Sequence, residues 1–384
     1  MNMPEIRFKD FKNEWKHFSF KEITYKAGIK NSENLSLESY SISNELGFIP
    51  QKEQFENGGT MSKADKRMYY IVSSNSFAYN PARINVGSLG YYQGLKDVIV
   101  SSLYEVFKTS DIVDDLFLLY WFKTNIFKRM IEQYQEGGVR LYFFFDKLQK
   151  CQIKIPSLQE QQKISSYFQK LDSLIQTTSK KLTSLKQIKA ASLQSMFPQE
   201  GETVPKVRFK GFEGGWDNNL ISNVCKIITG KSNTQDQVKN GLYPFFIRSE
   251  NIVRSNKYLY DCEAVITIGD GNIGRVFHYI NGKFDLHQRC YMMRNFRNVS
   301  ALYFYYYFSA FFYDRAIKMS AKATVDSVRL NMIADMNILY PKNKLEQQKI
   351  ASYFCNLDKQ ISLQTQRLEK LKQIKAACLD KMFV

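Results

Sequence analysis

The chain contains 384 residues, of which 44% are hydrophobic and 24% charged, and this globular composition excludes an intrinsically disordered protein. Six cysteines without a CxxC pair and only three histidines exclude a zinc ribbon or finger, offer no disulfide framework and predict no metal site. The formal net charge of +17 favours an acidic polymer as partner, nucleic acid before membrane.

The length predicts two or three domains. No apolar run approaches the ~18 residues of a membrane span, and the charged N-terminal segment lacks the apolar region of a signal peptide. We therefore expect a cytoplasmic protein with reduced thiols.

The first half opens with the motif PEIRFKDFKNEW at Pro4–Trp15. Short apolar and aromatic runs over residues 66–107, interrupted by Asn-Pro and glycine turn signals, predict β-strands. Residues 112–134 predict one buried amphipathic helix. An apolar run ending at Pro156 then leads into a long helix, Glu160–Phe197.

The second half follows the same plan after a linker at Pro198–Val204. The motif PKVRFKGFEGGW at Pro205–Trp216 repeats the opening motif. Residues 242–294 predict strands, and residues 299–319 predict a buried helix. A second long helix, Glu346–Phe383, completes a second α+β half.

The two long helices are copies of each other, because 22 of 38 positions are identical at a constant offset of 186 residues. Apolar residues recur at alternating spacings of four and three, which keeps a seam facing one partner helix. Such a seam favours two helices packed on each other, although two separate amphipathic helices, one on each domain, are an alternative. The predicted seam residues are Ile164, Phe168, Leu171, Ile175, Thr178, Leu182, Leu185, Ile350, Phe354, Leu357, Ile361, Gln364, Leu368 and Leu371.

Other apolar positions on these helices have two interpretations. They could bind partner helices in a four-helix bundle, or they could cap the core beneath each opening motif. These positions are Leu174, Ile188, Leu193, Met196, Leu379 and Met382. Because each long helix ends where an opening motif begins or would begin, we also expect a circular arrangement with the C-terminus near Pro4.

Motifs for catalysis are weak throughout the chain. GDGNIG at Gly269–Gly274 is followed by a strand-like segment, so it predicts a β-hairpin turn rather than a dinucleotide loop. Thr229–Ser232 resembles the end of a phosphate loop, but Cys225 stands where the first glycine should be. Asn80–Pro81 favours a type I turn over a methyltransferase motif. No catalytic residue is predicted.

Residues suited to reading nucleic acid are more plentiful in both bodies. Arginine pairs bidentately with guanine, asparagine and glutamine pair with adenine, and lysine binds phosphate. The candidates in the first body are Lys63, Lys66, Arg67, Tyr69, Asn80, Arg83, Tyr92 and Gln93. Those in the second body are Lys231, Arg248, Asn251, Arg254, Arg275, His278, Arg289, Lys322 and Arg329.

The layout resembles the specificity (S) subunits of type I restriction–modification systems. The similarity lies in the PxxRFKxF…W openings, the SFAYNPARINVGSLGYY stretch, and the junctions IPSLQEQQKI and YPKNKLEQQKI before the long helices. It implies an α+β fold in which two target-recognition domains, each a mixed β core with helices, are joined by two long helices forming an antiparallel coiled coil with pseudo-two-fold symmetry. The expected boundaries are 1–155 and 201–341 for the recognition domains, 156–200 for the central helix and linker, and 342–384 for the C-terminal helix.

The resemblance also implies a non-catalytic subunit whose domains each read half of a bipartite target in double-stranded DNA. The paired helices would set the spacing and dock two modification (methyltransferase) subunits, and restriction subunits would join through the complex. The chain itself would bind no cofactor, since S-adenosylmethionine, ATP and Mg are expected on the partner subunits. The alternatives are a stand-alone DNA methyltransferase or nuclease, and an RNA-binding or coiled-coil adaptor.

Overall fold

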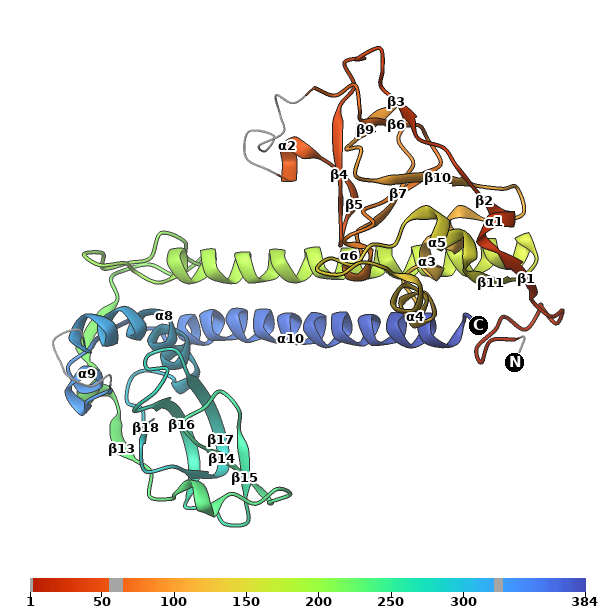
Figure 1. Ribbon diagram of the computed structural model, residues 1–384. Helices are drawn as coiled ribbons and strands as arrows, with labels where there is room; N and C mark the ends of the chain where they lie inside the picture. Colours follow the sequence, from red (N-terminus) through yellow and green to blue (C-terminus); the bar gives the residue numbers. More distant parts are fainter. Residues whose placement is uncertain (1–2, 55–64, 321–326) are drawn as a thin grey trace. The chain divides into compact units, whose positions relative to one another are not determined.

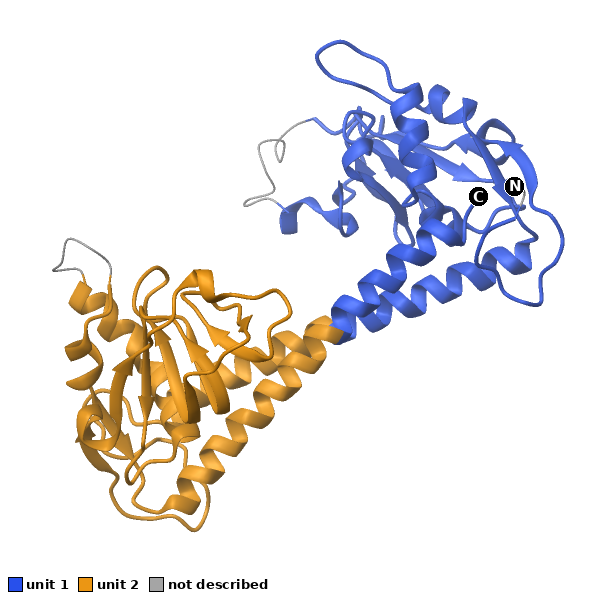
Figure 2. Ribbon diagram, turned by 90° about the horizontal axis from the view of Figure 1, so that it is seen from below, with its two compact units in different colours: residues 1–178, 367–384 blue, residues 179–366 orange. Residues whose placement is uncertain are grey.

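The computed structural model (Figure 1) describes residues 3–54, 65–320 and 327–384. They form two compact units (Figure 2), unit 1 from residues 1–178 and 367–384 and unit 2 from residues 179–366. Each unit contains an α+β body and a stretch of both long helices, α6 (Leu158–Met196) and α10 (Lys344–Lys381). The boundaries of the units therefore fall within the helices, whereas the sequence-based division assigns each helix to a separate spacer segment.

The body of unit 1 is built on β-sheets, and the five-stranded one is mixed because β4 runs parallel to β9. β1 pairs with β11, a four-stranded sheet has the order β2-β10-β7-β8, and a five-stranded sheet has the order β3-β6-β9-β4-β5. The strands are β1 Lys16–Ser19, β2 Thr24–Lys26, β3 Ile29–Lys30, β4 Ser39–Ser43, β5 Gly47–Pro50, β6 Tyr70–Val72, β7 Ser76–Tyr79, β8 Leu89–Tyr92, β9 Val98–Val100, β10 Glu105–Thr109 and β11 Gln152–Ile155. The helices are α1 Phe20–Ile23, α2 Gln51–Gln54, α3 Asp115–Trp121, α4 Asn125–Tyr134 and α5 Phe145–Lys150.

The single helix predicted over residues 112–134 is wrong, because the chain forms α3 and α4 with a break at Thr124. The Thr124 hydroxyl donates to the carbonyl of Trp121 and accepts from the amide of Phe127, so this one side chain ends α3 and begins α4. The two apolar segments share one core, which explains why their residues read as a continuous buried helix.

Unit 2 has one larger sheet, of order β13-β18-β16-β17-β14-β15, and a separate pair β12-β19. The GDGNIG segment connects the antiparallel strands β16 and β17, which confirms the predicted hairpin. The predicted helix at 299–319 is α8. The elements are β12 Asp217–Leu220, α7 Ile221–Val224, β13 Lys226–Thr229, β14 Tyr243–Phe246, β15 Val253–Ser255, β16 Tyr260–Ile268, β17 Phe277–Leu286, β18 Cys290–Arg294, α8 Ala301–Ser320, α9 Leu330–Ala334 and β19 Asn337–Tyr340.

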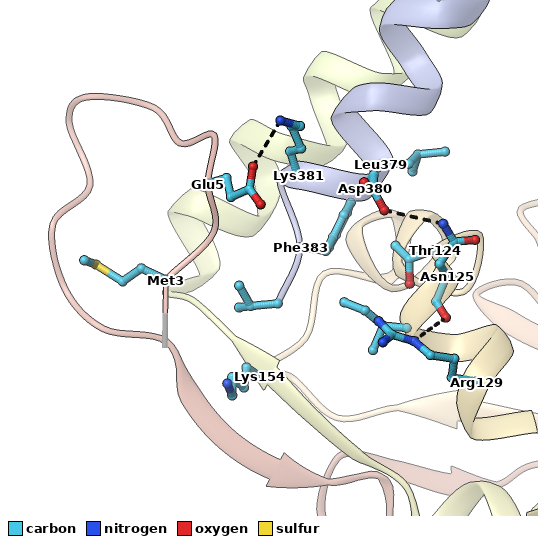
Figure 3. A pocket seen from close by; sticks show the side chains of 12 residues that line it. Met3, Glu5, Thr124, Asn125, Arg129, Lys154, Leu379, Asp380, Lys381 and Phe383 are labelled. Atoms are coloured by element: carbon cyan, nitrogen blue, oxygen red, sulfur yellow. Dashed lines mark hydrogen bonds and ion pairs between the residues drawn. The ribbon is translucent and has the colours of Figure 1, made fainter. Parts of the chain in front are cut away.

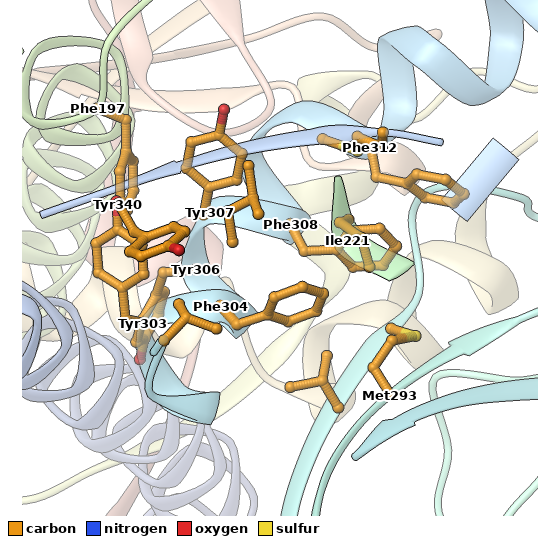
Figure 4. Packing of buried hydrophobic residues seen from close by; sticks show 14 of the residues in the cluster. Phe197, Ile221, Met293, Tyr303, Phe304, Tyr306, Tyr307, Phe308, Phe312 and Tyr340 are labelled. Atoms are coloured by element: carbon orange, nitrogen blue, oxygen red, sulfur yellow. The ribbon is translucent and has the colours of Figure 1, made fainter. Parts of the chain in front are cut away.

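Aromatic side chains of α8 form the centre of the unit 2 core. Tyr303, Tyr307 and Phe308 lie in a cluster with Phe197 at the end of α6 (Figure 4). Phe197 is fully buried and stacks on Phe354 of α10 with ring centroids 5.6 Å apart. The body of unit 2 is thereby joined to both long helices through one apolar core.

The long helices run antiparallel within each unit. In unit 1, Tyr167 of α6 contacts Cys378 of α10, and Asp172 contacts Lys375. The partner positions on α10 fall as those on α6 rise, which is the sign of an antiparallel pair. The same order holds in unit 2, where the contacting pairs are Lys189 with Asp358 and Ser192 with Tyr353.

Every predicted seam residue is buried or half-buried. Ile164 and Phe168 reach beyond the helix pair into the core of the unit 1 body, and Ile350 and Phe354 do the same in unit 2. Each helix pair therefore shares its core with a body. Among the described residues, no helix is both long and apolar enough to cross a lipid bilayer.

Candidate nucleic-acid interface

The opening motifs are held against the long helices by matching ion pairs. Arg7 Nε lies 2.7 Å from Glu160 Oε1, and Arg208 Nε lies 2.7 Å from Glu346 Oε1. Both glutamates are buried, and a buried carboxylate is tolerated when it is paired and hydrogen-bonded. The opening arginine and the first residue of EQQKI therefore form one structural element that occurs in each unit.

The first glutamine of each EQQKI motif fastens the body to the helix. In unit 1, Gln161 Oε1 accepts from the amide of Asp114, the N-cap residue of α3, and Nε2 donates to the carbonyls of Ile112 and Pro156. The buried side-chain amide of Gln161 thus makes three hydrogen bonds, all of them to backbone groups. Gln347 repeats the pattern in unit 2 with Ser300 N, Asn298 O and Pro341 O.

An aspartate at the middle of each helix pair joins three elements. Asp172 of α6 accepts from Lys375 of α10 and, at 2.9 Å, from the hydroxyl of Tyr120 in α3. The equivalent contacts in unit 2 are made by Asp358, Lys189 and Tyr306. Each of these residues lies 186 positions from its counterpart, so the contacts of one unit repeat in the other with the roles of α6 and α10 exchanged.

The C-terminal segment lies beside the opening motif, which confirms the expected circular arrangement. The amide of Ile6 donates to the carbonyl of Lys381, and Lys381 Nζ lies 3.1 Å from Glu5 (Figure 3). In unit 2 the amide of Val207 donates to the carbonyl of Ser195, the matching contact. The end of α10 thus supports the first body as the end of α6 supports the second.

The further apolar positions on the helices divide between the two interpretations left open by the sequence. Met196 and Met382 are buried, and Leu193 and Leu379 pack against the same cores. These four cap the cores beneath the opening motifs. Leu174 and Ile188 are exposed to solvent over a substantial part of their surface, as are Leu363 and Ile374 of α10.

The motifs that suggested catalysis have structural explanations. Gly230 follows β13 where the amides of Lys231 and Ser232 both donate to the carbonyl of Leu286, and a Cβ at Gly230 would lie 2.2 Å from that oxygen. Glycine is therefore required at position 230 because the backbone around Leu286 lies too close for a side chain, and not because a phosphate binds there.

Burial raises the pKa of three thiols to about 12, so they stay protonated at neutral pH: Cys151, Cys225 and Cys290.

The recognition candidates of unit 1 meet in part at one groove. Asn80 and Arg83 line it, beside the turn in which Asn80 Oδ1 accepts from the amide of Ala82. The groove has a volume of about 1000 Å³ and is also lined by Lys26 and Arg140. Its wall is aromatic, because Tyr142 and Phe144 stack with their ring centroids 5.4 Å apart and Tyr70 and Tyr104 face the same space.

The other candidates of unit 1 are dispersed. Tyr69 and Tyr92 are buried, and the Tyr92 hydroxyl donates to the carbonyl of Lys96, so these two side chains support the sheet rather than form a surface. Arg67 and Gln93 are exposed, and Lys66 is half-buried, but none of them lines the groove. Lys63 lies outside the described residues.

In unit 2 the structure brings Arg248 and Arg289 together at Asp270. Arg248 Nη1 lies 3.1 Å and Arg289 Nη1 lies 2.9 Å from the same oxygen, Asp270 Oδ2. Partial burial acts to raise the pKa of Asp270, but hydrogen bonds from Arg289 and Arg248 outweigh it and hold the pKa below its usual value. We name these three residues the arginine–aspartate cluster.

The remaining candidates of unit 2 are engaged differently. Arg254 donates to the carbonyls of Gly241 and Leu242, and the Arg275 guanidinium lies over the ring of Tyr313 at 4.3 Å. His278 contacts the carbonyl of Ser249 at 3.2 Å, close to Arg248 in the chain. Three more candidates are exposed and separate from the cluster contacts: Lys231, Asn251 and Arg329. Lys322 lies outside the described residues.

Asp270 is the residue of this surface that sequence reasoning did not select. A signal was present in the GDGNIG turn, since an aspartate between two glycines in a hairpin is displayed beyond the sheet. Its arginine partners come from two other loops, which no local pattern reveals.

The fold is that of a duplicated α+β domain whose two copies are joined by a pair of long helices. The chain belongs to the family described as the type I restriction modification DNA specificity domain, whose model matches residues 12–187 and 213–373. The two matches correspond to the two copies of the repeat. This finding agrees with the predicted fold class and with the predicted family.

Similar proteins support the assignment. The type I restriction enzyme EcoDI specificity subunit of Escherichia coli is 26% identical over 159 residues, which cover 41% of this chain and 35% of that protein. The match thus spans about a third of the curated relative. The crystal structure of a type I restriction–modification S subunit from M. genitalium has a TM-score of 0.68 at 13% identity, covering 100% of this chain and 99% of that one. A chain from a study of complex assembly in the type I R-M system has a TM-score of 0.50 at 14% identity, covering 96% and 97%. The structural matches show a shared fold.

Proposed function

We propose that this chain is the DNA-recognition subunit of a type I restriction–modification complex, with each body reading one half of a bipartite sequence in double-stranded DNA. The observation that carries the proposal is the contrast between joints that repeat within the chain and bodies that differ from each other. The Arg–Glu, Gln–backbone and Asp–Lys–Tyr contacts repeat at matching positions, while the sheets of the two units differ in strand number and order. Two different bodies attached to the helices through the same joints are suited to reading two different DNA sequences in the same way.

The helices would set the distance between the half-sites and bind two modification subunits. The exposed apolar side chains on α6 and α10 are the positions at which we place these contacts. They are Leu174, Ile188, Leu363 and Ile374. Chemistry would reside on the partners, with S-adenosylmethionine, ATP and Mg bound there. Restriction subunits would join through the same complex.

The experiment that tests this proposal is a binding selection from a library of randomised DNA duplexes with the full-length chain. The expected product is a sequence of two short specified segments separated by an unspecified gap. Replacing residues 17–150 by the corresponding segment of another family member should change one segment and leave the other intact, because the Arg7–Glu160 ion pair and β11 lie outside the exchanged residues and keep the attachment to α6.

Two outcomes would contradict the proposal. Equal affinity for RNA and for duplex DNA of any sequence would indicate an RNA-binding or coiled-coil adaptor. Methyl transfer or DNA cleavage by the chain without partners would indicate an enzyme in its own right.

The proposal also predicts that specific binding weakens steeply as the salt concentration rises, since phosphate contacts release counterions.

A further inference from the structure

The arginine–aspartate cluster of unit 2 is built from three separate loops. Arg248 follows β14, Asp270 lies in the turn between β16 and β17, and Arg289 lies in the turn between β17 and β18. The second and third loops are locked together, because the amide of Gly269 donates to the carbonyl of Arg289 at 2.7 Å. A Cβ at Gly269 would lie 2.6 Å from that oxygen, so glycine is needed for this approach.

The aspartate is also fixed from its other side. Asp270 pairs with Ser327 in an antiparallel bridge, and the amide of Val328 donates to the carbonyl of Gly269. The Asp270 side chain is only 22% exposed, whereas those of Arg248 and Arg289 are 43% and 63% exposed. A held carboxylate thus orients two accessible guanidinium groups.

Each arginine uses a single nitrogen, Nη1, for the contact with Asp270. Within the described part of the chain, no hydrogen bond or ion pair is found for the Nε and Nη2 groups of Arg248 and Arg289, so each keeps two parallel N–H donors on one edge. Two such donors match the O6 and N7 acceptors of guanine in the major groove. Arg254 differs, since its Nε and Nη2 are occupied by backbone carbonyls.

The carboxylate also favours a base over a phosphate. It neutralises one of the two positive charges and repels an approaching phosphate, but it leaves hydrogen bonding to neutral acceptors intact. Fixing Nη1 also reduces the rotamer entropy lost when the free edge binds a flat partner.

We propose that Arg248 and Arg289 read guanine in the half-site of unit 2, and that Asp270 is the positioning residue that sets their orientation. This inference rests on the proposed function, and it specifies the base class that this unit selects. It requires that the second half-site contain at least one obligatory G·C pair.

The test compares the full-length chain with three variants, Arg248→Lys, Arg289→Lys and Asp270→Asn, in duplex selection and competition assays. Lysine keeps the charge but lacks the two-donor edge, so discrimination for guanine should fall by about 10-fold at one position for each arginine variant. Asp270→Asn should weaken the same preference and steepen the salt dependence by about one unit of slope, because it uncovers a positive charge.

Two internal controls accompany these variants. The half-site read by unit 1 should be unchanged in all of them. Asp217→Asn removes an exposed carboxylate that contacts Lys342 at 3.5 Å in the separate β12–β19 pair, and it should leave both half-sites and the salt dependence unchanged. The control therefore matches the charge change of Asp270→Asn without touching the cluster.

The possible results separate the two proposals. A specific second half-site that requires no guanine would overturn this inference and leave the proposed function standing. The same conclusion follows if the lysine variants weaken binding equally for all sequences, since that is the behaviour of phosphate contacts. Failure of the unmodified chain to select any sequence would overturn the proposed function together with the inference.

Discussion

Replacing Asp172 by alanine removes the acceptor of two hydrogen bonds that join α6, α10 and α3 in unit 1. A hydrogen bond to a charged group contributes ~1.5–3 kcal/mol when it is well buried. The side chains of Asp172 and Lys375 are 35% and 22% exposed, so solvent screening lowers the ion pair to about 1 kcal/mol. The hydrogen bond from the Tyr120 hydroxyl adds about 1 kcal/mol, because removal of the aspartate leaves the hydroxyl of this buried tyrosine without its acceptor.

The expected loss is therefore about 2 kcal/mol in the free energy of unfolding of unit 1, which lowers the melting temperature by ~4–8 °C for a unit of this size. The assay is thermal and urea unfolding of the full chain, monitored by circular dichroism. Asp358→Ala supplies the matched twin in unit 2, where Lys189 and Tyr306 make the same contacts. It should destabilise by a similar amount.

A double-mutant cycle isolates the ion pair. Lys375→Met keeps the apolar stem of the lysine and removes its charge. The coupling energy between Asp172→Ala and Lys375→Met should be about 1 kcal/mol, with the remainder assigned to Tyr120. If Asp172→Ala changes the stability by less than ~0.5 kcal/mol, the reasoning that these contacts hold the joint together is refuted.

Three further outcomes are expected. Inserting one heptad after Thr178 and another after Gln366 lengthens each helix by ~10.5 Å. DNA selection should then return unchanged half-sites separated by a gap about three base pairs longer. Altered half-sites would contradict the role of the helices as a spacer. Gly230→Ala should cost ~2 kcal/mol or more in urea unfolding, because its Cβ would lie 2.2 Å from a carbonyl oxygen, whereas Gly215→Ala has open space and should be neutral. Burial lowers the pKa of His287, as do Arg248 and Arg289. Below the ordinary pKa of ~6.5 the unfolded chain therefore binds more protons than the folded chain. The stability that neutral His287 contributes should be fully present above pH ~6.5 and should be lost as the pH falls from ~6.5 toward the lowered pKa. His287→Asn should reduce this pH dependence in unfolding experiments at about pH 7.5 and 5.5.

The sequence was sufficient for the features that depend on local pattern or on repetition. The identity of 22 of 38 positions at one offset located both long helices. The alternating spacing of four and three between their apolar residues identified the face of each helix that is buried in the structure. The glycine spacing before a strand-like segment was enough to recognise the β16–β17 hairpin. Even the circular arrangement followed from the order of the repeated segments.

Local pattern failed where one residue serves two neighbours. The apolar run 112–134 has helical character throughout, but the Thr124 hydroxyl divides it into α3 and α4 through hydrogen bonds on both sides. Tyr69 and Tyr92 looked like surface residues because aromatic residues suit both stacking on bases and packing in a core. Their burial depends on neighbouring strands that sequence spacing does not specify.

The repeat shows that the polar residues at the joints are identical in the two halves, but it does not show which residues they contact. Glu160, Gln161 and Asp172 recur one repeat later, yet each has a partner more than 40 residues away in the chain, on the opening motif or in the body. Asp270 likewise becomes meaningful only when the fold brings Arg248 and Arg289 to it from separate loops. Sequence by itself determined the repeated scaffold, because helix and turn formation are governed by near neighbours. Only the tertiary structure decided which polar groups meet, because a hydrogen bond depends on positions in space that distant segments must supply together.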